Sequence, residues 1–316
     1  MVKKDNFKLI MISAMYENGG NTTHRLFDGH NEIHVYPFES QIGTKFVNDH
    51  LSSLFPQKYR WPIFPNSASP DELYEMIIDE ECKILAKTPY VSKFKDADFV
   101  FSEKGRKSEF VAFLAQRALS RKRIVEAFFV ATFHAWENYN RSGKEKYFMG
   151  YSPIVGVDSG KILQDFPGEA FILHVVRNPF SAYAETKKRP VPLSMDHYLT
   201  GWILCQLYAL WYKELYPDRF FIVRYEDIIK GPIAALDEFL TQTGLQKSDT
   251  LLYPSWNGKR LTEVYPWGTI RKADEKTNIE TARELSRKEL REISTRTNPQ
   301  LASFGYLPLA KKLLKT

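Results

Sequence analysis

The sequence has little of what structural metal sites and disulfide frameworks require. Cysteine occurs only twice in 316 residues, at Cys82 and Cys205, and neither has further cysteines or histidines at the spacing of a zinc site. This argues against a disulfide-stabilised module and against a zinc protein. We expect two buried thiols and no bound metal.

Long apolar runs are also absent. The run nearest the start, Leu9 to Met15, follows Lys3 and Lys4 but is too short for a membrane span and lacks a small-residue cleavage site. The sequence therefore predicts a protein without an integral membrane segment that works in the reducing cytoplasm.

What the sequence does contain is an aromatic and moderately basic composition. Aromatic residues make up 14% of the chain and hydrophobic residues 43%, which is enough for a sizeable core. The formal net charge of +6 favours anionic partners such as nucleotide phosphates. The densest basic clusters, 117–123 and 187–189, are short and lie beside predicted helices, so nucleic acid is not the expected partner.

Buried strands alternate with helices along the chain. Apolar runs predict strands at 8–15, 34–36, 170–176 and 220–223, and helical spacing predicts helices at 22–28, 109–118, 124–136, 194–215 and 233–244. This order is typical of an α/β fold with a parallel sheet covered on both faces, where ligands bind at the carboxyl ends of the strands. We expect one domain over residues 1–310 with a helical insertion at about 45–150, and a flexible tail over 311–316.

A glycine turn follows the first predicted strand and opens a helix. Its residues are Asn18, Gly19, Gly20, Asn21, Thr22 and Thr23. Backbone amides at such a turn converge at the positive end of the helix, and the glycines allow close approach, so we expect a phosphate site. A nucleoside triphosphatase would need a lysine after the last glycine of the loop, and this turn contains none.

Three segments of the chain resemble motifs of the sulfotransferases. The first starts at Asn18, continues through Leu26-Phe27-Asp28-Gly29-His30 and ends in Val35-Tyr36-Pro37-Phe38-Glu39, and it resembles the 5'-phosphosulfate loop and the helix after it. The second, His174-Val175-Val176-Arg177-Asn178-Pro179, resembles the 3'-phosphate motif. The third, Phe221 to Ile228, resembles the strand and helix that follow the nucleotide site. The middle of the chain does not resemble any of the family's motifs.

This resemblance implies a three-layer α/β fold with a central parallel sheet, of the P-loop NTPase-like kind. It also implies a sulfuryl donor, 3'-phosphoadenosine 5'-phosphosulfate, that needs no metal. Arg177 would bind the 3'-phosphate, because a guanidinium keeps its charge and donates several hydrogen bonds in a fixed fork. The core of the 5'-phosphosulfate loop is either Gly19 to Asn21, counting back from Asp28, or Gly20 to Thr22, matching by residue identity.

One departure from the family's pattern concerns the 3'-phosphate. In the family a serine eight residues after the arginine joins it on this phosphate. That position here is Glu185, whose charge would repel a phosphate. Ser181 or Thr186 is expected to take its place.

A second departure concerns the positive charge beside the leaving phosphate. Many relatives carry a lysine or arginine just before the loop glycine, where this chain has no basic residue. His24 and Arg25, on the helix after the loop, are the candidates to supply that charge. A late basic segment that ends in Arg271 and Lys272 is a further candidate for donor binding.

The acceptor's proton needs a carboxylate or an imidazole within reach. Glu39 is the first candidate, because it closes the segment after the loop, where protein-tyrosine sulfotransferases carry a catalytic glutamate. His30 and His34 are alternatives, since a neutral imidazole accepts a proton near neutral pH. A glutamate that caps a helix, and histidines that serve in packing, are the competing interpretations.

The predicted function is transfer of a sulfuryl group to an acceptor hydroxyl or amine, carried by a sugar, a phenol or a lipid. A nucleotide kinase on the same scaffold is an alternative that the missing loop lysine disfavours. A catalytically inactive nucleotide- or glycan-binding module is another, favoured by Glu185 and by the missing loop cation.

Overall fold

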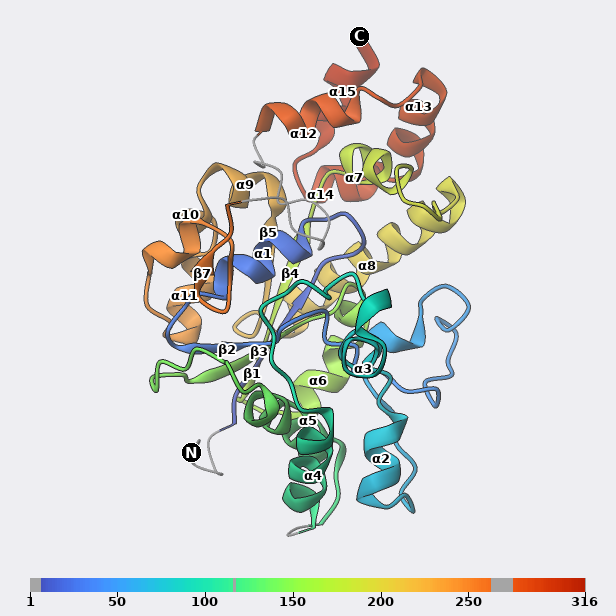
Figure 1. The fold of residues 1–316 in the computed structure, drawn as a ribbon. Coiled ribbons are helices and arrows are strands. Elements are labelled where there is room, and N and C mark those ends of the chain that lie inside the picture. Colours follow the sequence, from blue (N-terminus) through green and yellow to red (C-terminus); the bar gives the residue numbers. More distant parts are fainter. Residues whose placement is uncertain (1–6, 116–117, 263–274, 316) are drawn as a thin grey trace.

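A five-stranded parallel sheet forms the centre of the protein (Figure 1). The computed structural model describes residues 7–115, 118–262 and 275–315. The strand order is β2-β3-β1-β4-β5, and the strands are β1 (Leu9–Ser13), β2 (Ile33–Val35), β3 (Tyr147–Tyr151), β4 (Ala170–Val176) and β5 (Phe220–Arg224). The α/β class predicted from the sequence is confirmed.

Helices cover both faces of the sheet and make three layers. On one face, Leu9 and Met11 of β1 pack with α5 (Arg121–Ala135), α6 (Ser159–Asp165) and α8 (Met195–Leu215). On the other face, Ile10 and Ile12 pack with α1 (Gly20–Phe27), α9 (Tyr225–Lys230) and α11 (Asp237–Thr243). Alternate residues of β1 therefore face opposite layers, as the period of two in a strand requires.

The remaining helices lie at the two ends of the sheet. Near its amino end are α2 (Pro70–Met76) and α4 (Glu103–Leu114), and α3 (Glu80–Lys87) lies at its flank (Figure 1). The 3-10 turns η1 (Gln57–Tyr59) and η2 (Pro89–Val91) lie in the connections before α2 and after α3. Beyond the carboxyl ends of the strands are α7 (Pro179–Thr186), α12 (Glu275–Ala282), α13 (Arg287–Arg296), α14 (Asn298–Ser303) and α15 (Leu307–Lys315), as Figure 1 shows. The connections also contain η3 (Val155–Asp158), η4 (Asp249–Leu252), α10 (Pro232–Ala235) and a hairpin of β6 (Ser255–Trp256) and β7 (Lys259–Arg260). None of the described helices is both long and apolar enough to cross a membrane.

The strand β3 was not predicted from the sequence. It lies between β1 and β2, at the end of the segment expected to form a helical insertion. All five of its residues are buried, because layers pack on both of its faces. The run Tyr-Phe-Met-Gly-Tyr contains a glycine and shows no alternation, so its strand character depends on its neighbours.

Two further details differ from the sequence-based expectations. The helix expected at 233–244 is divided into α10 and α11, with a break at Leu236. Where a flexible tail was expected from residue 311, α15 instead continues to Lys315. The reason is packing, since Ala310 and Leu313 are buried against the cluster that α13 and α14 form.

Candidate functional site

The glycine turn lies at the carboxyl end of β1 and leads directly into α1. Gly20, Asn21 and Thr22 form the first turn of this helix, and the first backbone bond along it is from Thr23 N–H to the Gly19 carbonyl at 3.0 Å. The amides of the first turn therefore have no acceptor within the helix. Amides at this position, at the positive end of the helix dipole, are suited to an anion.

Both glycines of the turn are required by close tyrosines. Gly19 has φ 87°, in the left-handed region, and a Cβ there would lie 2.1 Å from Cδ2 of Tyr225. A Cβ on Gly20 would lie 2.3 Å from Cε2 of Tyr151. The rings of Tyr225 and Tyr151 thus form two walls of the loop, one from the end of β5 and one from the end of β3.

We expect Gly19→Ala to destabilise the protein by about 2–4 kcal/mol, because it combines an unfavourable φ with a buried clash. Gly231 provides a matched control: its φ is −169°, and no atom lies within 4 Å of a Cβ built there. Gly231→Ala should change stability by less than about 0.5 kcal/mol. Urea denaturation of both variants measures the difference, and equal effects would contradict the tight packing around the loop.

Asn18 joins the glycine turn to the end of β4. Its side chain is fully buried, and its Oδ1 accepts hydrogen bonds from the Arg177 backbone N–H at 2.9 Å and from Trp202 Nε1 at 3.2 Å. Its Nδ2 donates to the Tyr16 carbonyl at 2.9 Å. The loop after β1 and the loop after β4 therefore lie side by side at one edge of the sheet, and the Asn18 side chain is engaged in holding them there.

Arg177 lies at the carboxyl end of β4 with its guanidinium turned towards the glycine turn. Nη1 donates to the Glu17 carbonyl at 2.9 Å, and the guanidinium carbon lies 5.2 Å from the centre of the Tyr225 ring. Nε donates to Oδ1 of Asn278 at 2.7 Å. These hydrogen bonds within the protein use Nε and Nη1 of the guanidinium.

Asn278, on α12, is a member of this cluster that the sequence analysis missed. Its backbone carbonyl accepts a bond from Ser181 Oγ at 2.6 Å, and its Nδ2 donates to Glu226 Oε1 at 3.1 Å. It therefore contacts both Arg177 and Ser181. No motif in the sequence marks it, because it lies in a short polar helix that reaches the site only through the tertiary fold.

The three candidates that follow Arg177 are placed differently. Ser181 contacts the same asparagine as Arg177, as described above. Thr186 is fully buried and its hydroxyl donates to the Ala182 carbonyl at 2.9 Å, within its own helix. Glu185 forms an ion pair with Lys188 at 3.4 Å. Of these three side chains, Ser181 is therefore the one that shares a hydrogen-bond partner, Asn278, with the guanidinium of Arg177.

His24 and Arg25 face the protein interior. Nη1 of Arg25 pairs with Asp28 at 3.1 Å, and Nη2 donates to the Tyr36 carbonyl at 2.9 Å. Burial, and then the neighbouring guanidinium, hold the pKa of His24 well below its usual range, so this imidazole is neutral at physiological pH. The charge of Arg25 is balanced by Asp28, and His24 carries none.

His30 lies at the edge of the sheet opposite the glycine turn. It precedes β2, and residues that precede a parallel strand lie at the amino edge of the sheet. Its Nε2 bonds to the Gln246 carbonyl at 2.8 Å, and its Nδ1 accepts from the Glu32 N–H at 3.2 Å. Since a carbonyl only accepts, the proton is on Nε2 and both ring nitrogens are occupied.

His34 is part of the core. Its ring lies among Phe133, Tyr139 and Phe148, with ring centres between 4.7 and 5.7 Å away. Burial lowers the pKa of His34 to about 4, so it is neutral at physiological pH. This environment is that of a packing residue.

Glu39, in contrast, follows the carboxyl end of β2 and is half-buried at the same edge as the glycine turn. Burial, and next the charge of Glu39, raise the pKa of Tyr59, and the backbone N–H of Glu39 donates to Oε2 of Glu81 at 3.2 Å. Burial, and next the charge of Glu39, raise the pKa of Tyr151, the tyrosine that covers Gly20. Glu39 and the loop are thus close enough to share a neighbour.

Two of the predicted donor-binding residues, Arg271 and Lys272, lie outside the described residues. Within the described ranges there is no group of three or more His, Cys, Asp and Glu side chains that is arranged to hold a metal ion. The described site therefore consists of an amide-lined turn, one guanidinium, hydroxyl groups and carboxylates.

Comparison with known proteins finds a match to one protein family. A family model described as the sulfotransferase family matches residues 43–249. Among solved structures, the sulfotransferase domain from the curacin biosynthetic pathway is 12% identical with a TM-score of 0.50, over 94% of this chain and 99% of that chain. None of the curated proteins matches.

Two further solved structures are similar with lower TM-scores. The sulfotransferase domain from the Synechococcus PCC 7002 olefin synthase is 17% identical with a TM-score of 0.42, over 89% of this chain and 95% of that chain. Sulfotransferase STF9 from Mycobacterium avium is 11% identical with a TM-score of 0.41, over 78% of this chain and 66% of that chain. The curacin-pathway domain, at a TM-score of 0.50, supports a shared fold and nothing finer.

Proposed function

Since the chain belongs to the sulfotransferase family, we propose that it transfers a sulfuryl group from 3'-phosphoadenosine 5'-phosphosulfate to an acceptor hydroxyl or amine, such as that of a sugar, a phenol or a lipid. We further propose that residues 1–310 act as one catalytic domain, in the cytoplasm. Sulfotransfer as the general activity follows from the family. The donor, the acceptor class and the residue roles are the parts that experiments have to test.

The observation that carries the donor assignment is the adjacency of the glycine turn and Arg177. The Asn18 side chain bonds to the Arg177 backbone, and the Arg177 side chain bonds to the Glu17 carbonyl at 2.9 Å. A nucleotide with phosphates on both its 5' and 3' positions needs two anion sites a short distance apart. Free amides at the start of α1 suit the first phosphate, and the fork of Arg177 suits the second.

The composition of the glycine turn also supports this assignment. Gly19 and Gly20 add no side chain of their own beside the amides, and the rings of Tyr225 and Tyr151 pack directly against them. Ser181 adds a hydroxyl beside Arg177 through their common partner Asn278. These features support an oxyanion site and do not depend on a metal ligand.

In the proposed reaction, Glu39 takes the proton from the acceptor hydroxyl as a new S–O bond forms, and the S–O bond to the nucleotide's 5'-phosphate breaks. The donor supplies the sulfuryl group and leaves as the 3',5'-bisphosphate. The chain's own contribution is to align the acceptor opposite the leaving oxygen and to stabilise the charge that develops on the 5'-phosphate through the amides of α1.

The test is transfer of labelled sulfate from 3'-phosphoadenosine 5'-phosphosulfate to a panel of sugars, phenols, alcohols and amines in a chelating buffer. We expect label in at least one acceptor. Binding of the donor without any transfer would instead indicate a catalytically inactive nucleotide-binding module. Phosphate transfer from ATP that requires magnesium would indicate a kinase and contradict the proposal.

A further inference from the structure

A second carboxylate lies against the proposed base. Glu81, on α3, accepts the backbone N–H of Glu39 with Oε2 at 3.2 Å, and its Oε1 pairs with Nζ of Lys93 at 2.8 Å. The Glu81 side chain is 11% exposed, whereas Lys93 is 54% exposed. The Lys93 ammonium is therefore largely in solvent and compensates poorly for the buried Glu81 charge beside a second carboxylate.

This arrangement has an energetic cost. Burial, and next the charge of Glu39, raise the pKa of Glu81 from 4.5 to about 7. A carboxyl group whose pKa is higher in the folded than in the unfolded state destabilises the protein as the pH rises through that interval. A buried carboxylate that lowers stability at neutral pH, at the edge of a proposed reaction site, is a sign of a functional role.

We propose that Glu81 is a positioning residue for Glu39, which holds the Glu39 backbone in place and, when ionised, increases the tendency of the Glu39 carboxylate to accept the acceptor's proton. This inference rests on the proposed function. The physical reason is repulsion between like charges, which is partly relieved when Glu39 becomes neutral.

Other titratable groups also face this pair. Tyr59 comes from η1, Tyr16 and Glu17 from the loop after β1, Tyr151 from β3, and Lys93 from the segment after η2. Burial raises the pKa of each of the three tyrosines, so they stay neutral across the working range. Burial also raises the pKa of Glu17, opposed by Arg189. These groups are present in both the variant and the wild type, so comparing the two proteins at each pH leaves the Glu81 charge as the difference between them.

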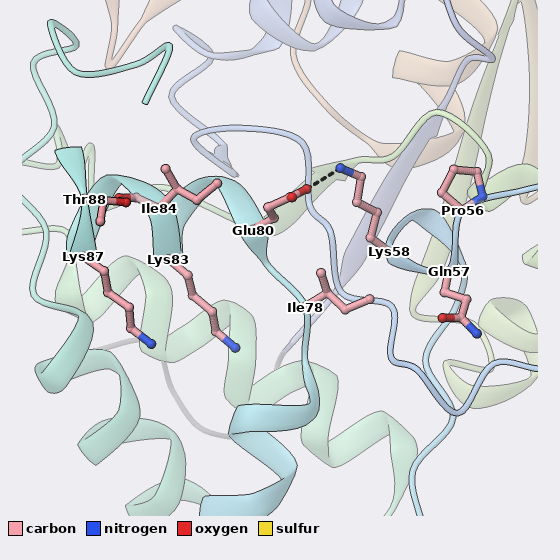
Figure 2. A pocket seen from close by; sticks show the side chains of 9 residues that line it. All are labelled: Pro56, Gln57, Lys58, Ile78, Glu80, Lys83, Ile84, Lys87 and Thr88. Carbon is pink, nitrogen blue, oxygen red and sulfur yellow. Dashed lines mark hydrogen bonds and ion pairs between the residues drawn. The ribbon is translucent and has the colours of Figure 1, made fainter. Parts of the chain in front are cut away.

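The neighbouring Glu80 provides a matched control on the same helix. Its carboxylate forms an ion pair with Lys58 at the edge of a separate pocket of about 630 Å³ (Figure 2). That pocket is lined by η1 and α3, and neither Glu39 nor Glu81 is among its lining residues. Glu80→Gln therefore removes a carboxylate from α3 without touching the proposed base.

The first measurement is the pH profile of donor turnover, with the best acceptor of the panel or with water as the acceptor. For Glu81→Gln we expect kcat at about pH 8 to fall roughly tenfold, and the difference to vanish at about pH 5.5, where wild-type Glu81 is protonated. The KM for the donor should not change. Glu80→Gln should follow the wild-type profile. A Glu81→Gln profile identical to the wild type would overturn the proposal.

The second measurement is thermal stability against pH. The pKa of Glu81 is 4.5 in the unfolded chain and about 7 in the fold, so its charge destabilises the wild type increasingly as the pH rises through this interval. Glu81→Gln should therefore melt higher than the wild type at about pH 8, and the difference should be lost at about pH 4. A carboxylate with a purely structural role would give the opposite result, a lower melting temperature at about pH 8. Higher stability together with lower kcat is the signature expected of the proposed role.

The same stability experiment separates this inference from the proposed function. If no acceptor and no hydrolysis were found for the wild type, the sulfotransfer assignment would fail. The interaction between the Glu81 and Glu39 carboxylates would still be measurable. The stabilisation that Glu81→Gln gives at about pH 8 should be smaller when Glu39 has also been replaced by glutamine. An equal stabilisation in both backgrounds would show that the two carboxylates do not interact and would overturn the inference.

Discussion

Replacing Glu39 by glutamine is expected to lower sulfate transfer by roughly 10²- to 10⁴-fold, which is the usual loss when a general base is removed. Glutamine has nearly the same shape as glutamate and keeps a side-chain oxygen, so the surrounding packing should persist. What is lost is the ability to accept the acceptor's proton. The measurement is kcat for labelled sulfate transfer under saturating donor.

Donor binding provides the control for this variant. The amides at the start of α1 and the guanidinium of Arg177 are unaffected by the change at Glu39, so 3',5'-phosphoadenosine phosphate should bind with wild-type affinity. Loss of both binding and turnover would indicate a folding defect instead of a catalytic one. Unchanged turnover would contradict the proposed role of Glu39.

The second large effect is expected for Arg177→Ala. A charge-assisted hydrogen bond to a phosphate contributes about 1.5–3 kcal/mol, so affinity for 3',5'-phosphoadenosine phosphate should fall by roughly 10- to 150-fold. Titration calorimetry in a metal-free buffer measures this directly. Arg177→Lys keeps the charge but lacks the fork, so it should recover only part of the affinity.

Adenosine 5'-phosphate is the matched ligand for this experiment. It lacks the 3'-phosphate, so its affinity should be nearly the same for the wild type and for Arg177→Ala. Arg177 also bonds to Glu17 and Asn278 within the protein, so the substitution could alter the loop itself. An unchanged affinity for adenosine 5'-phosphate would show that the loop has kept its shape. Equal losses for both nucleotides would contradict the assignment of Arg177 to the 3'-phosphate.

The observed contacts explain why some expectations for the site differ from its geometry. Arg25 follows the glycine turn in sequence and carries a positive charge, so it suggested a phosphate contact. In the fold it turns inward to Asp28, at 3.1 Å, and both side chains are 2% exposed. The direction of a side chain on a helix depends on which face meets the core, and a short helix such as α1 gives a weak periodic signal.

The sequence by itself determined the scaffold and the two anion-binding candidates. Apolar runs marked β1, β4 and β5, and parallel strands place their carboxyl ends at one edge. The turn at Gly19 and Gly20 and the guanidinium of Arg177 were therefore expected at that edge, where the structure has them. These features depend on local patterns and on the geometry of parallel sheets, which a sequence records directly.

Only the tertiary structure decided the position of β3, the contact of Asn278 with Arg177 and Ser181, and the approach of Glu81 to Glu39. Asn278 is 101 positions from Arg177 along the chain, and no local pattern marks it as a partner of Arg177. The physical reason is that burial, charge balance and hydrogen-bond partners are set by whichever distant segments pack together. Propensity and periodicity act within a few turns of chain and carry no record of those distant contacts.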